Sequence, residues 1–173
     1  MIKIAIVGTH GTGKSTLSYN LAAHYKSIGK SVKIVQEVAR SCPFPINEKM
    51  TIEAAKWIFL EHSRKELEAS KNQVVICDRS VLDSFIYAEY FKLEDDLIDE
   101  YKRLALHKLK EYNKIIYIRP NLFIHDDGVR AQDNEFQLSI DNLFFEKLKE
   151  KKYIEMNSSE IFEKGNKWKS YCL

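Results

Sequence analysis

Residues 8–15 of this chain read GTHGTGKS, and this stretch decides the fold. It matches the pattern G-x-x-x-x-G-K-[ST] of a phosphate-binding P-loop at every fixed position. The β-rich run at residues 2–7 predicts a strand before the loop, and apolar residues at helical spacing over residues 15–28 predict a helix after it. Because the motif requires this strand–loop–helix context, we expect the loop to bind the phosphates of a nucleotide.

Each residue type in the loop has a physical reason. The glycines let the backbone curl so that successive N–H groups point at one anion, and the helix N-terminus adds its positive dipole end. Lys14 supplies a charge for the β- and γ-phosphates, and the Ser15 hydroxyl is a candidate Mg²⁺ ligand. His10 occupies a variable position and is better explained as a surface residue than as a catalytic one. The predicted nucleotide-binding residues are Gly8, His10, Gly11, Thr12, Gly13, Lys14, Ser15 and Thr16.

Length and composition limit the class of protein. A chain of 173 residues fits one domain, and we predict a single domain over residues 1–173. The net charge of +2 is too close to neutral to indicate nucleic-acid binding. The longest apolar runs are too short to cross a bilayer, and the first residues show no targeting pattern. Cys42, Cys77 and Cys172 lack metal-ligand spacing, which favours a reducing, cytoplasmic setting.

Further along the chain, β-rich runs alternate with helical patterns, which predicts an α/β protein with a parallel sheet. The fully apolar run at residues 74–77 indicates a strand that is buried on both faces. The other predicted strands are residues 32–35, 115–118 and 153–155. The later predicted helices are residues 48–70, 81–91, 97–112, 134–149 and 158–164.

Charged residues follow the second and third predicted strands, where an open parallel sheet has its ligand crevice. Glu37 is a candidate acceptor for the proton of an attacking hydroxyl, and Arg40 is nearby. Asp78 is a candidate for holding the water shell of Mg²⁺, and Arg79 for stabilising charge on the transferred phosphoryl group. The alternatives are a surface Glu37 and a buried, purely structural Asp78–Arg79 pair.

Residues 119–134 are polar and charged, and we predict that they form a lid that excludes water from the γ-phosphate. Arg119 and Arg130 are candidates to reach the phosphates from this lid. Gly128 gives the backbone freedom there. Residues 125–127 (HDD) fit a solvated acidic turn better than a metal site.

The acceptor pocket is expected from residues 41–59 and from the helix that follows Asp78. Aromatic side chains in these segments are candidates to stack on a flat base, although aromatics at helical spacing more often belong to a core. The candidates are Phe44, Trp57, Phe85 and Tyr87.

These motifs together resemble the P-loop nucleoside and nucleotide kinase superfamily. The closest likeness is to the ribosylnicotinamide-kinase-like family of small P-loop proteins. It rests on residues 8–15, on the Glu-x-x-Arg of Glu37 and Arg40, on Asp78-Arg79 before a helix, and on the DDGVR of residues 126–130. The resemblance implies a three-layer α/β sandwich with a five-stranded parallel sheet in the order 2-3-1-4-5 and helices on both faces. It also implies ATP and Mg²⁺ as cofactors.

We therefore predict Mg²⁺-dependent phosphoryl transfer from ATP to a nucleoside, a nucleotide or a nicotinamide riboside-like acceptor. Two alternatives stay open: a P-loop ATPase that acts as a regulatory or binding module, and a polynucleotide kinase, which the near-neutral charge disfavours. No Asn-Lys-x-Asp pattern follows the fourth predicted strand, which disfavours a GTPase. We expect no membrane or nucleic-acid partner, and the sequence leaves a homodimer open.

Overall fold

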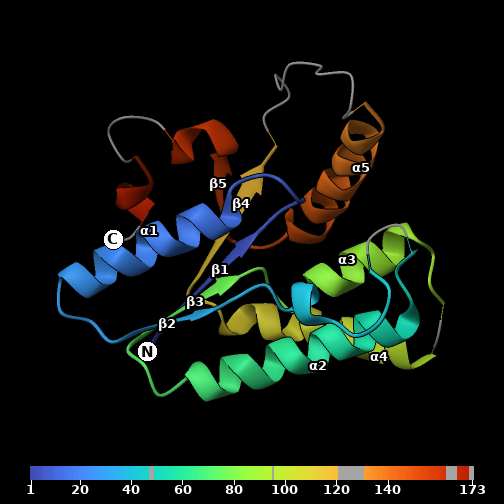
Figure 1. The fold of residues 1–173 in the computed structure, drawn as a ribbon, viewed down its shortest axis with the longest axis horizontal. Helices are drawn as coiled ribbons and strands as arrows, with labels where there is room; N and C mark the ends of the chain where they lie inside the picture. Colours follow the sequence, from blue (N-terminus) through green and yellow to red (C-terminus); the bar gives the residue numbers. More distant parts are fainter. Residues whose placement is uncertain (47–48, 95, 121–130, 163–166, 172–173) are drawn as a thin grey trace.

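Five parallel strands form the central sheet in the order β2-β3-β1-β4-β5 (Figure 1). The strands are β1 (Ile2–Val7), β2 (Val32–Val35), β3 (Val74–Asp78), β4 (Lys114–Arg119) and β5 (Ile154–Asn157). The computed structural model describes residues 1–46, 49–94, 96–120, 131–162 and 167–171. The observed order and the parallel pairing confirm the predicted fold class.

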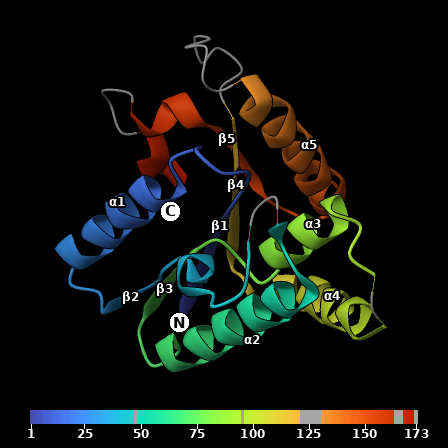
Figure 2. The ribbon, with the colours of Figure 1, turned by 45° about the vertical axis from the view of Figure 1, so that its right-hand side comes forward.

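Helices cover both faces of the sheet, so the fold has three layers (Figures 1 and 2). One face carries α1 (Lys14–Ser27) with the short 3₁₀ helices η4 (Ser158–Ile161) and η5 (Lys167–Tyr171). The opposite face carries the remaining helices. These are η1 (Val38–Ser41), α2 (Ile52–Ala69), α3 (Asp83–Tyr90), α4 (Asp96–Lys108), η3 (Leu109–Glu111) and α5 (Ala131–Leu148).

The alternation of side chains along the strands divides the core in two. In β1, Ile4 and Ile6 pack toward α1, whereas Ala5 and Val7 pack toward α3 and α5. All four side chains are fully buried, as expected for a strand in the middle of a parallel sheet. Within the described residues, no helix combines the length and the apolar character needed to cross a bilayer.

Several element boundaries differ from the predicted ones. The helix predicted at residues 48–70 begins at Ile52, because the Thr51 side chain accepts a hydrogen bond from the Ala54 N–H and caps the helix there. The helix predicted at residues 134–149 begins earlier, at Ala131, so the last residues of the predicted 119–134 loop are helical. The helix predicted at residues 158–164 is the shorter η4, and η5 was not predicted from the sequence.

A buried ion pair connects β1 to α2. The Nζ atom of Lys3 lies 2.6 Å from Oε2 of Glu66 and 3.1 Å from a carboxylate oxygen of Glu111. The other oxygen of Glu66 accepts a hydrogen bond from the Tyr112 hydroxyl and lies 3.0 Å from Nε2 of His62. Burial by itself raises the pKa of Glu66, but His62 and Lys3 outweigh it and lower that pKa to about 2.

We expect Glu66→Gln to destabilise the fold by about 3–5 kcal/mol at neutral pH, because it leaves the buried charge of Lys3 poorly matched. A carboxylate whose pKa is lowered on folding stabilises the fold above its unfolded pKa of about 4.3 and loses that effect as the pH falls. For Glu66 the loss runs from that value down toward about pH 2. The free energy of unfolding, measured in urea at neutral pH and at about pH 3, should therefore differ less between the two pH values in the variant than in the wild type.

The control for this prediction is the double variant Lys3→Met/Glu66→Leu. Replacing a buried ion pair with apolar residues is often neutral or stabilising, so this protein should lose less stability than Glu66→Gln. The remaining loss comes from the Tyr112 hydroxyl, which no longer has its carboxylate partner. If Glu66→Gln lowered the free energy of unfolding by less than about 1 kcal/mol, the Lys3–Glu66 pair would contribute no more than an exposed surface pair.

Candidate active site

The P-loop leaves the carboxyl end of β1 and enters α1 at Lys14. At two positions the conformation of the loop backbone requires glycine. Gly8 has a φ of 136°, and a Cβ atom there would lie 2.3 Å from the carbonyl oxygen of Ile118 in β4. Gly13 has a φ of 85° at the N-cap of α1. The loop therefore passes too close to the sheet for any larger residue at position 8.

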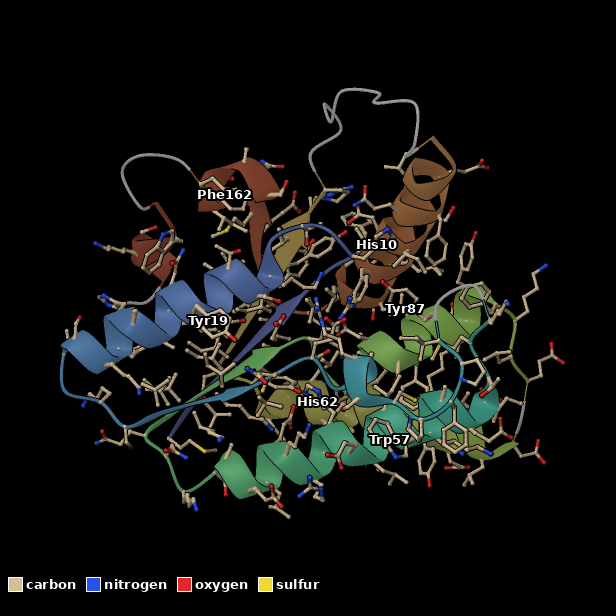
Figure 3. The ribbon with its side chains drawn as sticks, in the orientation of Figure 1. His10, Tyr19, Trp57, His62, Tyr87 and Phe162 are labelled. Carbon is tan, nitrogen blue, oxygen red and sulfur yellow. The ribbon has the colours of Figure 1, made fainter. Side chains whose placement is uncertain are left out.

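A cavity of about 420 Å³ lies beside the loop. Its walls come from residues 10–16 of the P-loop, from η1 and the residue before it, from the segment between β3 and α3, and from the facing side of α2. In Figure 3, His10, Tyr87 and His62, which all line this cavity, come from the loop, from α3 and from α2 respectively. The predicted site residues from Lys14 to Thr16, Glu37, Asp78 and Arg79 all line it as well.

Lys14 is buried at the base of the loop, with 6% of its surface exposed. Its Nζ atom donates a hydrogen bond to the Thr9 carbonyl and lies 3.3 Å from Oγ1 of Thr12. Burial, followed by the nearby charge of Arg79, lowers the pKa of Lys14 to about 7. With a pKa of about 7, Lys14 is only partly protonated at neutral pH.

Ser15 and Asp78 bring two oxygen ligands together at the start of α1. The Ser15 hydroxyl donates a hydrogen bond of 2.6 Å to Oδ2 of Asp78. A hydroxyl and a carboxylate are the hard oxygen ligands that Mg²⁺ prefers, so these two side chains fit a magnesium ion bound with phosphate oxygens and water.

Arg79 is held between two carboxylates. Its Nε atom lies 2.5 Å from Oε1 of Glu37, and its Nη1 atom lies 3.3 Å from Oδ1 of Asp83. Its guanidinium also lies over the Tyr87 ring, 5.7 Å from the centroid. The backbone of Arg79 has a φ of 84°, a strained value for a residue with a side chain, and such strain is often found at functional sites.

Glu37 is paired with two arginines, because its second oxygen accepts a 2.7 Å hydrogen bond from Nε of Arg40. Burial raises the pKa of Glu37, but the charge of Arg79 and the hydrogen bond from Arg40 outweigh burial, and the net result lowers it. Glu37 is thus ionised at neutral pH, with one arginine bound to each carboxylate oxygen, and its lowered pKa makes it a weaker base than an ordinary glutamate.

Asp83 is a site residue that the sequence reading missed. Its Oδ2 atom accepts hydrogen bonds of 2.7 Å from the Ser80 N–H and 2.9 Å from the Ser80 hydroxyl, just before α3 begins. Burial raises its pKa, although Arg79 and the Ser80 hydrogen bonds act in the opposite direction. The Ser80-x-x-Asp83 spacing, typical of a helix start, was the available signal.

The loop also contacts α5, far along the chain. The side-chain amide of Gln137 donates a 2.7 Å hydrogen bond to the His10 carbonyl, and the His10 ring stacks on Phe136 with centroids 5.5 Å apart. His10 therefore contacts both the cavity and α5. The sequence held no signal for this contact.

The structure separates Arg119 from these residues. Arg119 ends β4 and bonds Oδ2 of Asp141 through Nη2 at 3.0 Å and Nε at 3.2 Å, and it does not line the described cavity. Arg130, with the rest of residues 121–130, lies outside the described residues. Of the aromatic candidates, Tyr87 lines the cavity, whereas Phe85 packs in the core against Phe59.

One group of side chains next to the cavity has the spacing of a metal site. One ligand atom each from His62, Glu66 and Cys77 lies within 4.8 Å of the others. The ammonium group of Lys3 already lies 2.6 Å from Glu66, so the carboxylate charge is matched without a metal ion. We interpret this group as part of the buried ion-pair network.

The fold, the loop and its flanking strand and helix define an α/β protein of the P-loop class. The chain belongs to the family described as the AAA domain, whose sequence model matches residues 3–164. A comparison with curated proteins gives no match.

Two solved structures show the same fold. Thymidylate kinase from Ehrlichia chaffeensis has a TM-score of 0.66 and 20% identity, over 90% of this chain and 86% of that chain. The NadR protein, solved in complex with NR, has a TM-score of 0.64 and 17% identity over 89% of this chain. The chain spans only 43% of that NadR chain.

We expect ADP binding to take up a proton at alkaline pH, because phosphate binding must restore the charge that burial removes from Lys14. At about pH 8 the uptake should approach one proton per nucleotide and should be much smaller at about pH 6. Calorimetry in two buffers of different ionisation enthalpy measures this uptake. In Lys14→Met it should disappear, and a buffer-independent binding enthalpy of the wild type at the higher pH would contradict the assignment.

Proposed function

We propose that this protein transfers the γ-phosphate of ATP to a small acceptor that binds in the cavity beside the P-loop. The observation that carries this proposal is the set of side chains that line the cavity. It extends beyond the phosphate loop to the apolar side chains of Val38, Ile46, Met50 and Ile58, between η1 and α2. An enzyme that only hydrolyses ATP has no need for this apolar half, whereas a pocket for a flat organic ring does.

The roles of the loop residues follow from their positions. Lys14 and the loop N–H groups bind the β- and γ-phosphates, and Ser15 and Asp78 bind Mg²⁺ directly or through water. The ion neutralises charge on the phosphates when it is bound. Asp83 and Glu37 fix the guanidinium of Arg79 so that it faces the cavity without rearranging during transfer.

The charges around the cavity favour a hydroxyl acceptor over a phosphate acceptor. Within the described lining of the cavity, Arg79 is matched by two carboxylates, and Arg40 is exposed and bound to Glu37. A phosphate acceptor needs cations of its own, whereas a hydroxyl needs a carboxylate to receive its proton. Nucleosides and nicotinamide riboside-like compounds therefore fit better than nucleotides.

A panel of acceptors tests the proposal. Nucleosides, nicotinamide riboside and their monophosphates are each incubated with ATP and Mg²⁺, and the phosphorylated product is measured beside free phosphate. We expect product from a hydroxyl acceptor. ATP turnover that no small acceptor changes would favour the ATPase alternative, and product from a 5′-hydroxyl oligonucleotide alone would favour the polynucleotide kinase alternative.

Glu37→Gln should lower the rate of transfer to the hydroxyl acceptor by about 10²-fold, at the lower end of the usual range for a general base because the pKa of Glu37 is already depressed. ADP affinity should change little. Arg40→Gln is the matched control, since it removes an exposed partner of Glu37 but keeps the pair with Arg79. If both variants lowered the transfer rate by the same small factor, Glu37 would not be the group that accepts the proton.

Asp78→Asn should shift the Mg²⁺ concentration needed for half-maximal transfer upward and slow the reaction, because the amide keeps the shape of Asp78 but not its charge. Nucleotide affinity measured without metal should stay near that of the wild type. An unchanged Mg²⁺ titration would show that Asp78 serves only as the hydrogen-bond partner of Ser15.

A further inference from the structure

The outer edge of β2 forms the floor of a second groove, away from the P-loop. β2 is the first strand in the sheet order, and in the described part of the chain it pairs only with β3. β2 lies between α1 and α2 in the ribbon (Figures 1 and 2). Residues of both helices line the groove together with residues 32–36. Its floor is thus a strand edge, and its walls are two helices.

The backbone of β2 presents to this groove hydrogen-bonding groups that have no partner among the described residues. The Ser31 carbonyl accepts a hydrogen bond from the Val74 N–H of β3. Because alternate residues of a parallel strand bond to the same neighbour, Lys33 and Val35 also face β3. The N–H and C=O groups of Val32 and Ile34 therefore point outward, as on any open sheet edge.

The two walls of the groove differ in chemistry. Val32 and Ile34 are half-buried and pack with the α1 side of the core. On this side α1 lines the groove with Tyr19, Ala22, Ala23 and Lys26, so the wall is mostly apolar and carries one lysine. Lys33 has the opposite orientation, because side chains alternate along a strand. Lys33 therefore lies on the α2 side of the groove, where three further cationic side chains line it: Arg64, Lys65 and Lys71.

The groove is strongly basic for this protein. Five cationic side chains and one carboxylate, Glu68, line it, so it has an excess of four positive charges, whereas the whole chain has a net charge of +2. Arg64 is paired with Glu61 and Glu68, and Nζ of Lys65 lies 3.5 Å from the Glu61 carboxylate. Lys33 and Lys71, in contrast, make no ion pair within the described residues.

We propose that this groove binds an extended acidic segment of another protein, which adds to the sheet as a strand beside β2. Main-chain hydrogen bonds to Val32 and Ile34 provide the pairing, and alternate side chains of the segment face the two walls. The mostly apolar α1 wall then favours apolar residues of the segment, and the more basic α2 side favours acidic ones. The recognised sequence therefore alternates acidic and apolar residues.

A second copy of this chain is a poorer occupant. In a symmetric dimer the same patch meets itself, so the basic wall beside Lys33 would face its own copy. Like charges brought together in this way oppose association. The excess charge of the groove favours an acidic partner over self-pairing.

Fluorescence anisotropy with a labelled peptide of alternating glutamate and valine tests the proposal. We expect saturable binding that weakens as salt is added, because the basic wall supplies part of the attraction. A peptide of the same composition with its glutamates and valines in separate blocks should bind at least about tenfold more weakly. N-methylation of alternate peptide bonds, on the edge that faces β2, should have a similar effect, because it removes strand hydrogen bonds and keeps the charge.

Lys33→Glu should weaken binding of the alternating peptide by at least about tenfold. Lys152→Glu is the matched control, since this exposed lysine precedes β5 at the opposite edge of the sheet and should leave binding unchanged. Both variants should keep the wild-type melting temperature and phosphoryl transfer, so the result is independent of the proposed reaction.

Three outcomes would overturn the proposal. Equal binding of the alternating and block peptides would mean non-specific charge attraction. Tighter binding of a single-stranded oligonucleotide would identify a nucleic-acid surface instead. Absence of peptide binding at low salt would show that the lysines only protect the β2 edge from pairing.

Discussion

The register between β1 and β3 determines where the site forms. Ile6 lies opposite Asp78, and the Arg79 N–H continues the ladder by donating a 3.0 Å hydrogen bond to the Ile6 carbonyl. The two strands therefore end side by side, and Asp78 reaches Ser15 across the gap. A shift of one residue would turn every side chain of β3 to the opposite face and separate this pair.

The same register explains why two arginine–carboxylate contacts accompany the loop. After Asp78 the chain must leave the sheet at once, and it does so through the left-handed backbone of Arg79. The Ser80–Asp83 hydrogen bonds then begin α3. Asp83 and Glu37 together fix the guanidinium, so the strained turn and the ion pairs belong to one arrangement. Strain of this kind persists only where the surroundings over-determine it.

The parts of the molecule that sequence alone could predict are those encoded locally. The loop pattern, the apolar strand runs and the charged residues that follow them are all short-range signals, and the fold they predicted is the one observed. Contacts between residues far apart in the sequence could not be predicted. Arg119 was expected near the phosphates, but its side chain bonds Asp141 in α5, which is 22 residues further along the chain. Gln137 meets His10 across 127 residues, a separation at which sequence patterns specify no pairing.

The contact between α5 and the loop has a mechanical consequence. Gln137 and Phe136 hold the loop backbone at His10 through a hydrogen bond and a ring stack, so α5 and the loop cannot move apart without losing both. The positions of α5 and of the loop are therefore energetically coupled. By reciprocity, if a ligand that binds α5 changes the affinity of the P-loop for phosphate, phosphate binding changes the affinity for that ligand by the same factor.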